Sequence, residues 1–459
     1  MLSRLLQPEI QSLITERQLG VLKDILTEWT PADIADLIVE LPENEQVIVF
    51  RLLHDELAAD TFEHLDFDTQ ETLIKAMGKE EVAAVLNEMS ADDRTALFEE
   101  MPSSAAKQLI QLLSHEERLI ANALLGYPEN SVGRLMTPDY IAANPDMTVQ
   151  QVLDYIRIHG EDKETLNIVY IVDEKGKLID DIKIREFLLA PLDSPVSDLM
   201  NENFVALNVN DDQESAVELF KKYDRVALPV VDKSGILLGI VTVDDVLDVA
   251  EEEATEDIHK LSAIEALEDP YPELPIMTII KKRVPWLSLL LIGQSLTAIA
   301  MGFFEDELLK VAALAIFIPM LISSGGNSGS QAATLVVRAM ALGEITLRDW
   351  WLIMRREIFS GFAMGIVLGL IGFAQVVIIA QFSSEISSYL SLIALTVGVS
   401  LIGIVLWGNM AGSMLPFVLK RFGIDPATSS APLVATLVDV TGIIIYFTVA
   451  LFILSGKLL

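Results

Sequence analysis

The second half of the chain contains long apolar stretches, and these limit its possible folds more than any other feature. Five of them lie near residues 285–304, 309–337, 354–380, 388–416 and 428–455. Each has about 20 residues or more, the length that a helix needs to cross about 30 Å of hydrocarbon. We therefore predict a transmembrane domain of five α-helices over residues 276–459.

Charge is divided unevenly between the two halves. The chain has 32 Lys and Arg against 67 Asp and Glu, but residues 281–459 hold only 11 and 9 of them. The first 280 residues therefore carry 21 basic and 58 acidic side chains, a net charge of −37. Such acidity excludes a nucleic-acid partner, which needs a basic surface, and suits solubility or cation binding. The chain has no cysteine, which also excludes thiolate metal sites.

Basic residues around the apolar stretches predict the orientation in the membrane. Nine of the eleven fall on one side: Lys281, Lys282, Arg283, Arg338, Arg348, Arg355, Arg356, Lys420 and Arg421. The positive-inside rule assigns that side to the cytosol. The N-terminus lacks the basic and apolar pattern of a signal peptide. We expect a multi-pass protein of the cell membrane, with a cytosolic N-terminal domain and the C-terminus outside.

Residues 1–128 show short helical patterns with polar caps and no strand-like alternation. Thr30-Pro31 and Ser90-Ala91 have the residue types that begin helices. Leu41-Pro42 is repeated 60 residues later as Met101-Pro102. Repeated helical units of this kind predict an all-α superhelical domain.

A strand–turn–strand–helix pattern follows and occurs twice, over residues 129–195 and 196–250. The pair resembles tandem cystathionine-β-synthase (CBS) domains, and the second copy has the familiar ending Gly239–Asp245. The first copy is degenerate, with Lys183 and Glu186 where Thr242 and Asp245 fall. Thr242 and Asp245 are thus the candidates for nucleotide contact, with ATP as a possible modulator. Residues 246–275 follow as an acidic linking helix, which Pro270, Pro272 and Pro275 end.

Polar residues within the apolar stretches are the candidates for function. Ser323–Gln331 contains Gly325-Gly326-Asn327 and is expected to break its helix; tight packing of small residues is the alternative. Asp439 lies about eleven residues inside the last stretch, where a carboxylate costs about 2.5–3.5 kcal/mol. A cation from solution would be a suitable partner. The alternative is a protonated Asp439 hydrogen-bonded to Asn409 or to the Gly-Gly-Asn segment.

Over its whole length the chain resembles the MgtE-type magnesium channels of bacteria. The motifs that carry the resemblance are Glu253–Leu261, Gly325–Asn327, Gly423–Ala427 and Pro432–Gly442. The resemblance implies a homodimer in a lipid membrane with one Mg²⁺ pathway on its two-fold axis. It also implies that the acidic linking helix is a plug that ties the CBS domains to the pore. From the charge of −37 we expect cytosolic Mg²⁺, bound between the helical, CBS and plug segments, to offset their repulsion and close the pore.

The resemblance also implies two sets of Mg²⁺ ligands. The pore set contains Asp439 and Asp425, and we add Asn327 and Asn409 because a hydrated hard cation suits such oxygens. The regulatory set is Asp60, Asp92, Asp212, Glu214, Asp224, Asp245, Asp248, Glu253, Glu256 and Asp257. Ala96 stands where relatives have a second acid after Asp92, which weakens that part of the regulatory set.

Two other classes of protein are considered. A nucleotide-sensing CBS protein anchored in the membrane would use the CBS pair as its active part. An enzyme such as an ion-pumping ATPase is not expected, because the sequence has no Gly-x-x-x-x-Gly-Lys-Ser/Thr loop and no nucleophile with a base at a usable spacing.

Overall fold

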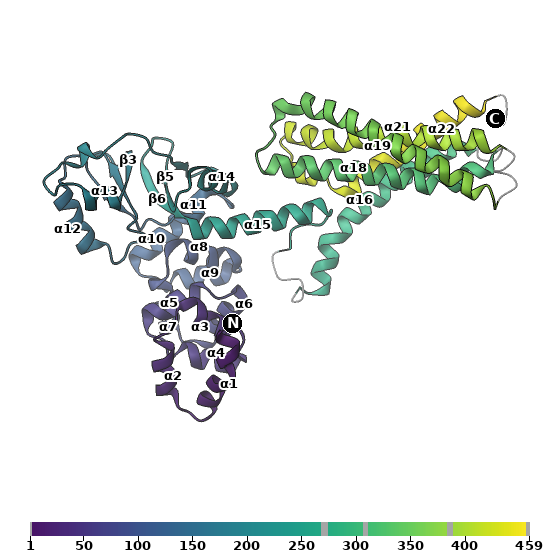
Figure 1. The fold of residues 1–459 in the computed structure, drawn as a ribbon. Coiled ribbons are helices and arrows are strands. Elements are labelled where there is room, and N and C mark those ends of the chain that lie inside the picture. The colour runs from purple at the N-terminus through teal and green to yellow at the C-terminus, as the bar shows by residue number, and fades with distance from the viewer. Residues whose placement is uncertain (1, 268–273, 306–310, 383–388, 456–459) are drawn as a thin grey trace. The chain divides into compact units, whose positions relative to one another are not determined.

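The structure is a computed structural model that describes residues 2–267, 274–305, 311–382 and 389–455. The chain divides into two compact units, Met1–Glu251 and Glu252–Leu459. Figure 1 shows their elements in chain order by colour, and each unit is described by itself below.

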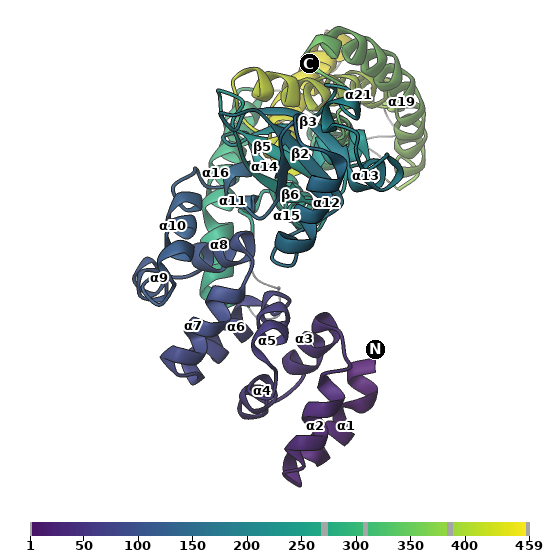
Figure 2. The same cartoon turned by 90° about the vertical axis from the view of Figure 1, so that its left-hand side faces the viewer.

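The first part of unit one is built from short helices. Within the described residues these are α1 (Leu2–Thr15), α2 (Leu19–Leu26), α3 (Pro31–Val39), α4 (Glu43–Phe50), α5 (Asp55–Glu63), α6 (Phe67–Ala76), α7 (Lys79–Glu88), α8 (Ala91–Glu100), α9 (Ser103–Ile110) and α10 (His115–Leu124). Helices two apart in the chain pack together, such as α3 on α5 and α5 on α7, which produces the stack seen in Figure 2. A continuous core runs from Ile10 to Ala121. The predicted helix starts are confirmed, since α3 begins at Pro31 and α8 directly after Ser90.

Two small sheets with the same topology follow. The first contains β1 (Ile141–Ala143), β2 (Ile168–Val172) and β3 (Leu178–Lys183), and the second contains β4 (Leu207–Asn208), β5 (Ala227–Val231) and β6 (Leu237–Thr242). In each sheet the first pair of strands is parallel and the second antiparallel. Gly176 and Gly235 have positive φ at equivalent turns, a conformation that glycine adopts without strain. Two reciprocal backbone hydrogen bonds join the two copies at these turns. Leu178 N–H donates to Gly235 O, and Leu237 N–H donates to Gly176 O.

The remaining helices of this part cover the sheets. They are α11 (Val132–Leu135), α12 (Val149–His159), α13 (Ile184–Leu189), the 3₁₀ turn η1 (Val196–Asp198) and α14 (Gln213–Tyr223). The acidic linking helix is α15 (Val243–Leu261), which starts directly after β6. Its first residues belong to unit one and its residues from Glu252 to unit two.

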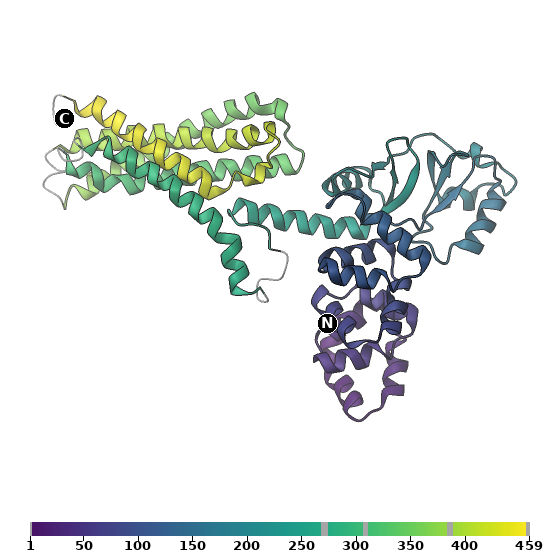
Figure 3. The same cartoon turned by 180° about the vertical axis from the view of Figure 1, so that it is seen from behind.

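Unit two is a bundle of long helices, seen from behind in Figure 3. They are α16 (Ile276–Gly302), α18 (Ile318–Ala341), α19 (Trp350–Ile379), α21 (Leu390–Arg421) and α22 (Ala431–Leu454), with 3₁₀ turns η2 (Ala312–Phe317), η3 (Leu347–Asp349) and η4 (Pro426–Thr428). Helix α21 packs on α18, α19 and α22, and α18 also packs on α22. Within the described residues α16 touches chiefly α22.

Four stretches are long and apolar enough to cross a membrane: Ile276–Gly302, Leu347–Ile379, Leu390–Arg421 and Ala431–Leu454. Helix α18 has 24 residues, but its polar run lowers its hydropathy and it is not among them. The predicted count of five spans therefore stays a prediction. The expected break at Gly325–Asn327 was wrong, because α18 is a continuous α-helix from Ile318 to Ala341.

Close packing explains why this polar run stays helical. Gly325, Gly408 and Gly412 leave no room for a side chain between α18 and α21: a Cβ on Gly408 would lie 2.5 Å from Gly325 O. A Cβ on Gly412 would collide with Gly329 O even more severely. The small residues thus let the two backbones touch, as in other membrane helix pairs.

Replacing Gly412 by alanine is expected to destabilise unit two by roughly 1–3 kcal/mol, because the added methyl meets backbone that cannot move aside. Thermal unfolding of the full chain in detergent measures the effect. Gly302→Ala is the matched control, since a Cβ there meets nothing within 4 Å. Equal unfolding temperatures for both variants would contradict the packing argument.

Candidate metal sites

Asp439 lies on α22 and is half-buried against α18. A Cβ placed on Gly326 would be 3.8 Å from Asp439 Oδ1 and 3.4 Å from the Cβ of Ala435. The carboxylate therefore faces the Gly-Gly-Asn segment, and the absence of a side chain on Gly326 lets α18 and α22 approach closely there. Among the described residues, no hydrogen-bond donor and no basic group contacts this carboxylate. An anionic group without a partner at this depth suits a cation from solution.

The two predicted asparagines differ in environment. Asn327, next to Gly326 on α18, is exposed in the single chain. Asn409 on α21 is only 1% exposed, and the hydrogen bonds of its side chain go to residues other than Asp439. Its amide N–H donates to Glu357 Oε2 at 3.0 Å, and its carbonyl oxygen accepts from the Ser328 hydroxyl. The structure thus brings together Asp439 and the segment around Asn327, whereas Asn409 belongs to a separate buried network.

Asp425 begins the turn η4, where its Oδ1 accepts from Ala427 N–H at 2.8 Å. Its Oδ2 accepts from Lys260 Nζ at 2.6 Å, and the same ammonium lies 2.6 Å from Glu256 Oε1. Burial, together with the charge of Asp425, raises the pKa of the Asp257 carboxyl to about 6. The predicted residues of the plug and of the pore mouth therefore meet in unit two. Lys260, which sequence reasoning did not single out, is the cation that bridges them.

A second group of acids lies within unit one, where α8 meets the start of α15. Asp92 is only 6% exposed, and burial followed by the charge of Asp245 raises its pKa. Burial likewise raises the pKa of Asp245 to about 7, even though Thr242 Oγ1 donates to its Oδ2 at 2.7 Å. Asp248 is also in this group, and its pKa is raised by burial and by Asp244.

Sequence reasoning missed several members of this group, which we call the α8–α15 acidic cluster. They are Glu63, Asp93, Glu164 and Asp244. Burial raises the pKa values of Glu63, Asp93 and Glu164. The charge of Asp244 raises the pKa values of Asp245 and Asp248. Asp93 and Asp244 could have been found as sequence neighbours of Asp92 and Asp245. Glu63 and Glu164 carry no such signal, since only the fold brings them near.

Of the other predicted regulatory residues, Asp60 lies at the edge of this cluster, where its charge helps to raise the pKa of Glu63. Asp60, Asp212, Glu214 and Asp224 are exposed, and Asp212 caps α14 by accepting from Glu214 N–H at 3.0 Å. Within the described ranges, no three Asp, Glu or His side chains are gathered closely enough to hold a bare metal ion. A hydrated Mg²⁺, which keeps several waters, does not need such a compact set.

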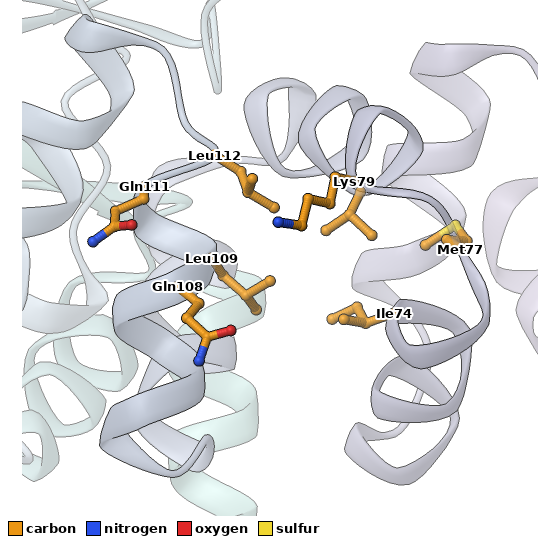
Figure 4. A pocket seen from close by; sticks show the side chains of 8 residues that line it. Ile74, Met77, Lys79, Gln108, Leu109, Gln111 and Leu112 are labelled. Carbon is orange, nitrogen blue, oxygen red and sulfur yellow. The ribbon is translucent and has the colours of Figure 1, made fainter.

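A pocket of about 350 Å³ in the helical domain does not suit a cation. Figure 4 shows it between α6, α7 and α9, lined by Ile74, Met77, Lys79, Val82, Gln108, Leu109, Gln111 and Leu112. The lining has no carboxylate, and its only charged group is cationic. We assign no Mg²⁺ to it.

The acidic cluster predicts how stability depends on pH. The folded-state pKa values of Asp245 and Glu63, both about 7, exceed the unfolded value of about 4. Between these two pKa values the folded state binds more protons than the unfolded state. The free energy of unfolding therefore increases as the pH falls from about 8 to about 5, and this contribution is lost as the pH rises through 7. Each carboxyl contributes up to about 1.4 kcal/mol per pH unit.

Asp92→Asn is expected to reduce this dependence, because it removes one charge from the cluster. Hydrogen exchange at α8 and the start of α15, measured without Mg²⁺ in the full chain at pH 6 and pH 8, reports the change. Asp24→Asn serves as the control, since Asp24 is exposed on α2. An Asp92→Asn protein with the wild-type pH dependence would contradict the role of the cluster.

Comparison with known proteins decides the family. Residues 318–449 match the family model described as a divalent cation transporter, MgtE, residues 29–130 match the MgtE intracellular N domain, and residues 132–193 and 196–252 match the CBS domain. The chain is 38% identical over 451 residues to the magnesium transporter MgtE of Thermus thermophilus, covering 97% of this chain and 98% of the relative. The chain belongs to the MgtE family of magnesium transporters.

Other relatives agree with this assignment. The magnesium transporter MgtE of Bacillus subtilis is 30% identical over 438 residues, covering 95% of each chain. The crystal structure of the cytosolic domain of the Mg²⁺ channel MgtE in complex with ATP matches 53% of this chain and 99% of its own, at 34% identity and a TM-score of 0.51. The soluble part of a magnesium transporter matches 55% and 99%, at 26% identity and a TM-score of 0.52.

These findings confirm the predicted architecture of an MgtE N domain, a CBS pair and a C-terminal region of apolar helices. They also confirm that the chain is a member of a transporter family and not an enzyme.

Proposed function

We propose that this protein moves Mg²⁺ across the cell membrane into the cytosol through unit two, with Asp439 as the ion-binding residue. The observation that carries the proposal is the Asp439 carboxylate, which has no hydrogen-bond or ionic partner among the described residues and lies against Gly326 of α18. The names of the relatives, which are magnesium transporters, support the choice of ion.

The Asp439 carboxylate of a single chain supplies one negative charge, whereas Mg²⁺ carries two positive charges. A homodimer with its two-fold axis at the pore would bring two copies of Asp439 to one hydrated ion. The exposure of α16 supports this assembly, since only 6% of its apolar window is buried within the chain. Because magnesium holds its waters tightly, two carboxylates and nearby carbonyl or amide oxygens suffice, and Asn327 is the candidate amide.

The gate in this proposal is the acidic linking helix. Asp257 and Glu256 lie near Asp425 in unit two, and the α8–α15 acidic cluster lies in unit one. Mg²⁺ between such carboxylates offsets their repulsion and favours the compact, closed arrangement; without Mg²⁺ the repulsion favours the open one. This is a population shift caused by the higher affinity of one state for the ion. The excess of basic residues on one side of the spans supports a cytosolic position of the regulatory domains.

Flux across a membrane potential, with and without Mg²⁺ on the side of the regulatory domains, tests the proposal directly. Proteoliposomes loaded with a Mg²⁺-sensitive dye are expected to take up Mg²⁺ when the regulatory side holds little of it, and to stop when it holds several millimolar. Absence of uptake under both conditions would contradict transport. Uptake that ignores Mg²⁺ on the regulatory side would contradict gating alone.

Nucleotide is a second candidate ligand, as a modulator. The solved cytosolic domain of a relative contains ATP. Thr242 ends β6 and Asp245 lies in the first turn of α15, where the second CBS copy would contact a nucleotide. In this chain Thr242 is buried and hydrogen-bonded to Asp245. A membrane-anchored nucleotide sensor without transport is the alternative. Mg²⁺ uptake unaffected by Asp439→Ala would favour it.

A further inference from the structure

Glu357 is a carboxylate inside the candidate span Leu347–Ile379 that sequence reasoning did not assign to any role. It follows Arg355-Arg356 in the chain, so its sequence context is that of a helix end in the cytosol. In the structure it lies within α19 and is half-buried. A half-buried carboxylate at the arginine-bearing end of α19 is expected to have polar or charged partners.

Its contacts form a chain of hydrogen bonds across three helices. Asn409 Nδ2, on α21, donates to Glu357 Oε2 at 3.0 Å. The carbonyl oxygen of the same amide accepts from Ser328 Oγ, on α18. Asn409 is 1% exposed and Ser328 is 8% exposed, so neither group can replace its partner with water. Both polar ends of the Asn409 side chain are therefore used, one toward each neighbouring helix.

Glycines prevent the amide from turning elsewhere. On the α19 side, a Cβ on Gly361 would lie 3.1 Å from the Asn409 Cβ and 3.3 Å from its Nδ2. On the α18 side, Gly329 brings its backbone against Gly408, where a Cβ would lie 2.9 Å from Gly408 O. Asn409 is thus held between two closely packed backbones, and its orientation depends on the two hydrogen bonds.

Ser328 is two residues beyond Gly326, so the network reaches the helix that faces the ion-binding carboxylate. Gly326 packs on Ala435 and faces Asp439 of α22, while Ser328 on the same turn is bonded toward α21. A rotation of α18 about its axis would break the Ser328 bond and change the contact of Gly326 with Ala435 and Asp439. The network therefore connects Glu357 to the helix that lies against Asp439.

We propose that Glu357 is a positioning residue for ion selection: through Asn409 and Ser328 it fixes the rotation of α18 opposite Asp439. The inference rests on the proposed function, since it assumes that Asp439 meets the ion. An ionised acceptor makes a stronger hydrogen bond than a neutral one, and loss of the acceptor leaves a buried N–H of Asn409 without a partner. The wall formed by Gly326 then loosens and accepts divalent ions larger than Mg²⁺.

The test compares Glu357→Ala with Glu357→Gln in proteoliposomes that contain the full chain. Glu357→Ala is expected to lower maximal Mg²⁺ flux about tenfold or more and to lower the ratio of Mg²⁺ to Ca²⁺ flux, the size expected for a lost hydrogen bond to a charged group. The Mg²⁺ concentration at half-maximal flux stays near the wild-type value, because Asp439 is unchanged. Glu357→Gln restores most of both losses, since its amide oxygen accepts the same bond from Asn409. Glu344→Ala, at an exposed loop position, is the control and leaves all values unchanged.

A second measurement separates this inference from the proposed function. Hydrogen exchange of the detergent-solubilised chain is expected to speed up at the α18 amides around Gly326 in Glu357→Ala, and to stay slow in Glu357→Gln and Asp439→Asn. Unchanged exchange in Glu357→Ala, or equal losses in the Ala and Gln variants, would overturn the positioning role. If the wild-type protein does not transport Mg²⁺ in the flux assay, the proposed function fails. The hydrogen-exchange result still decides whether Glu357 positions α18.

Discussion

Replacing Asp439 by asparagine is expected to reduce Mg²⁺ flux by at least about a hundredfold. Asparagine keeps the size of the side chain but removes the charge that lies against Gly326 of α18. Two missing charges in a dimer weaken the site strongly, because a carboxylate is the preferred partner of a hard divalent cation and the surroundings are apolar. Uptake of Mg²⁺ by proteoliposomes, driven by a membrane potential, measures the loss.

A matched control separates the charge of Asp439 from the net charge of the chain. Glu344→Gln removes one acidic charge at an exposed position of unit two, and its flux should equal that of the wild type. Hydrogen exchange along α22 checks that the Asp439→Asn chain is folded. Wild-type flux in a folded Asp439→Asn protein would show that this carboxylate does not meet the ion.

Neutralising Glu253, Glu256 and Asp257 together, to Gln, Gln and Asn, is expected to leave the pore open at Mg²⁺ concentrations that close the wild type. Glu256 is bridged to Asp425 by Lys260, and the raised pKa of Asp257 reflects burial near the same Asp425. Without the three acids, Mg²⁺ loses the carboxylates nearest Asp425 through which it would hold the closed state. We expect the concentration for half-closure to rise about tenfold or more, which corresponds to at least about 1.4 kcal/mol of differential binding.

The control for this variant removes the same charge elsewhere. Glu9, Asp24 and Glu28 are exposed on the helical domain, and their triple neutralisation changes the net charge equally. If closure depends on the local site, this control closes at the wild-type concentration. An equal increase of the Mg²⁺ concentration for half-closure in both triple variants would mean that this concentration depends on the net charge of the chain rather than on the linking helix. Full closure of the Glu253, Glu256 and Asp257 variant at wild-type Mg²⁺ would contradict the gating proposal.

Local signals in the sequence predicted much of the architecture because each is confined to neighbouring residues. Thr30-Pro31 begins a helix by its own chemistry, since the Thr30 hydroxyl accepts from Asp33 N–H and proline fits the first turn. The turns ending at Gly176 and Gly235 repeat at the same point of both CBS copies, so the pattern indicated two equivalent units.

The expected break in α18 failed for a reason that lies outside that helix. Glycine and serine disfavour an isolated helix, and a polar run in a lipid-facing helix is costly. Here Gly325 and Gly329 instead bring the backbone of α21 into contact, and Ser328 finds Asn409. Partners supplied by α21, more than 70 residues later in the chain, keep the segment helical.

Composition and periodicity by themselves determined that this protein has an acidic half, with helices and a twice-repeated strand–turn–strand–helix pattern, and an apolar half of long helices. These properties follow from which residues occur and how they are spaced, because burial and hydrophobicity act through local patterns. The tertiary structure alone decided which charges meet. Glu164 joins the cluster of Asp92, Lys260 reaches Asp425, and Glu357 reaches Ser328 through Asn409. Electrostatic and hydrogen-bond partners depend on distances in space, and residues far apart in the chain become neighbours only when the helices pack.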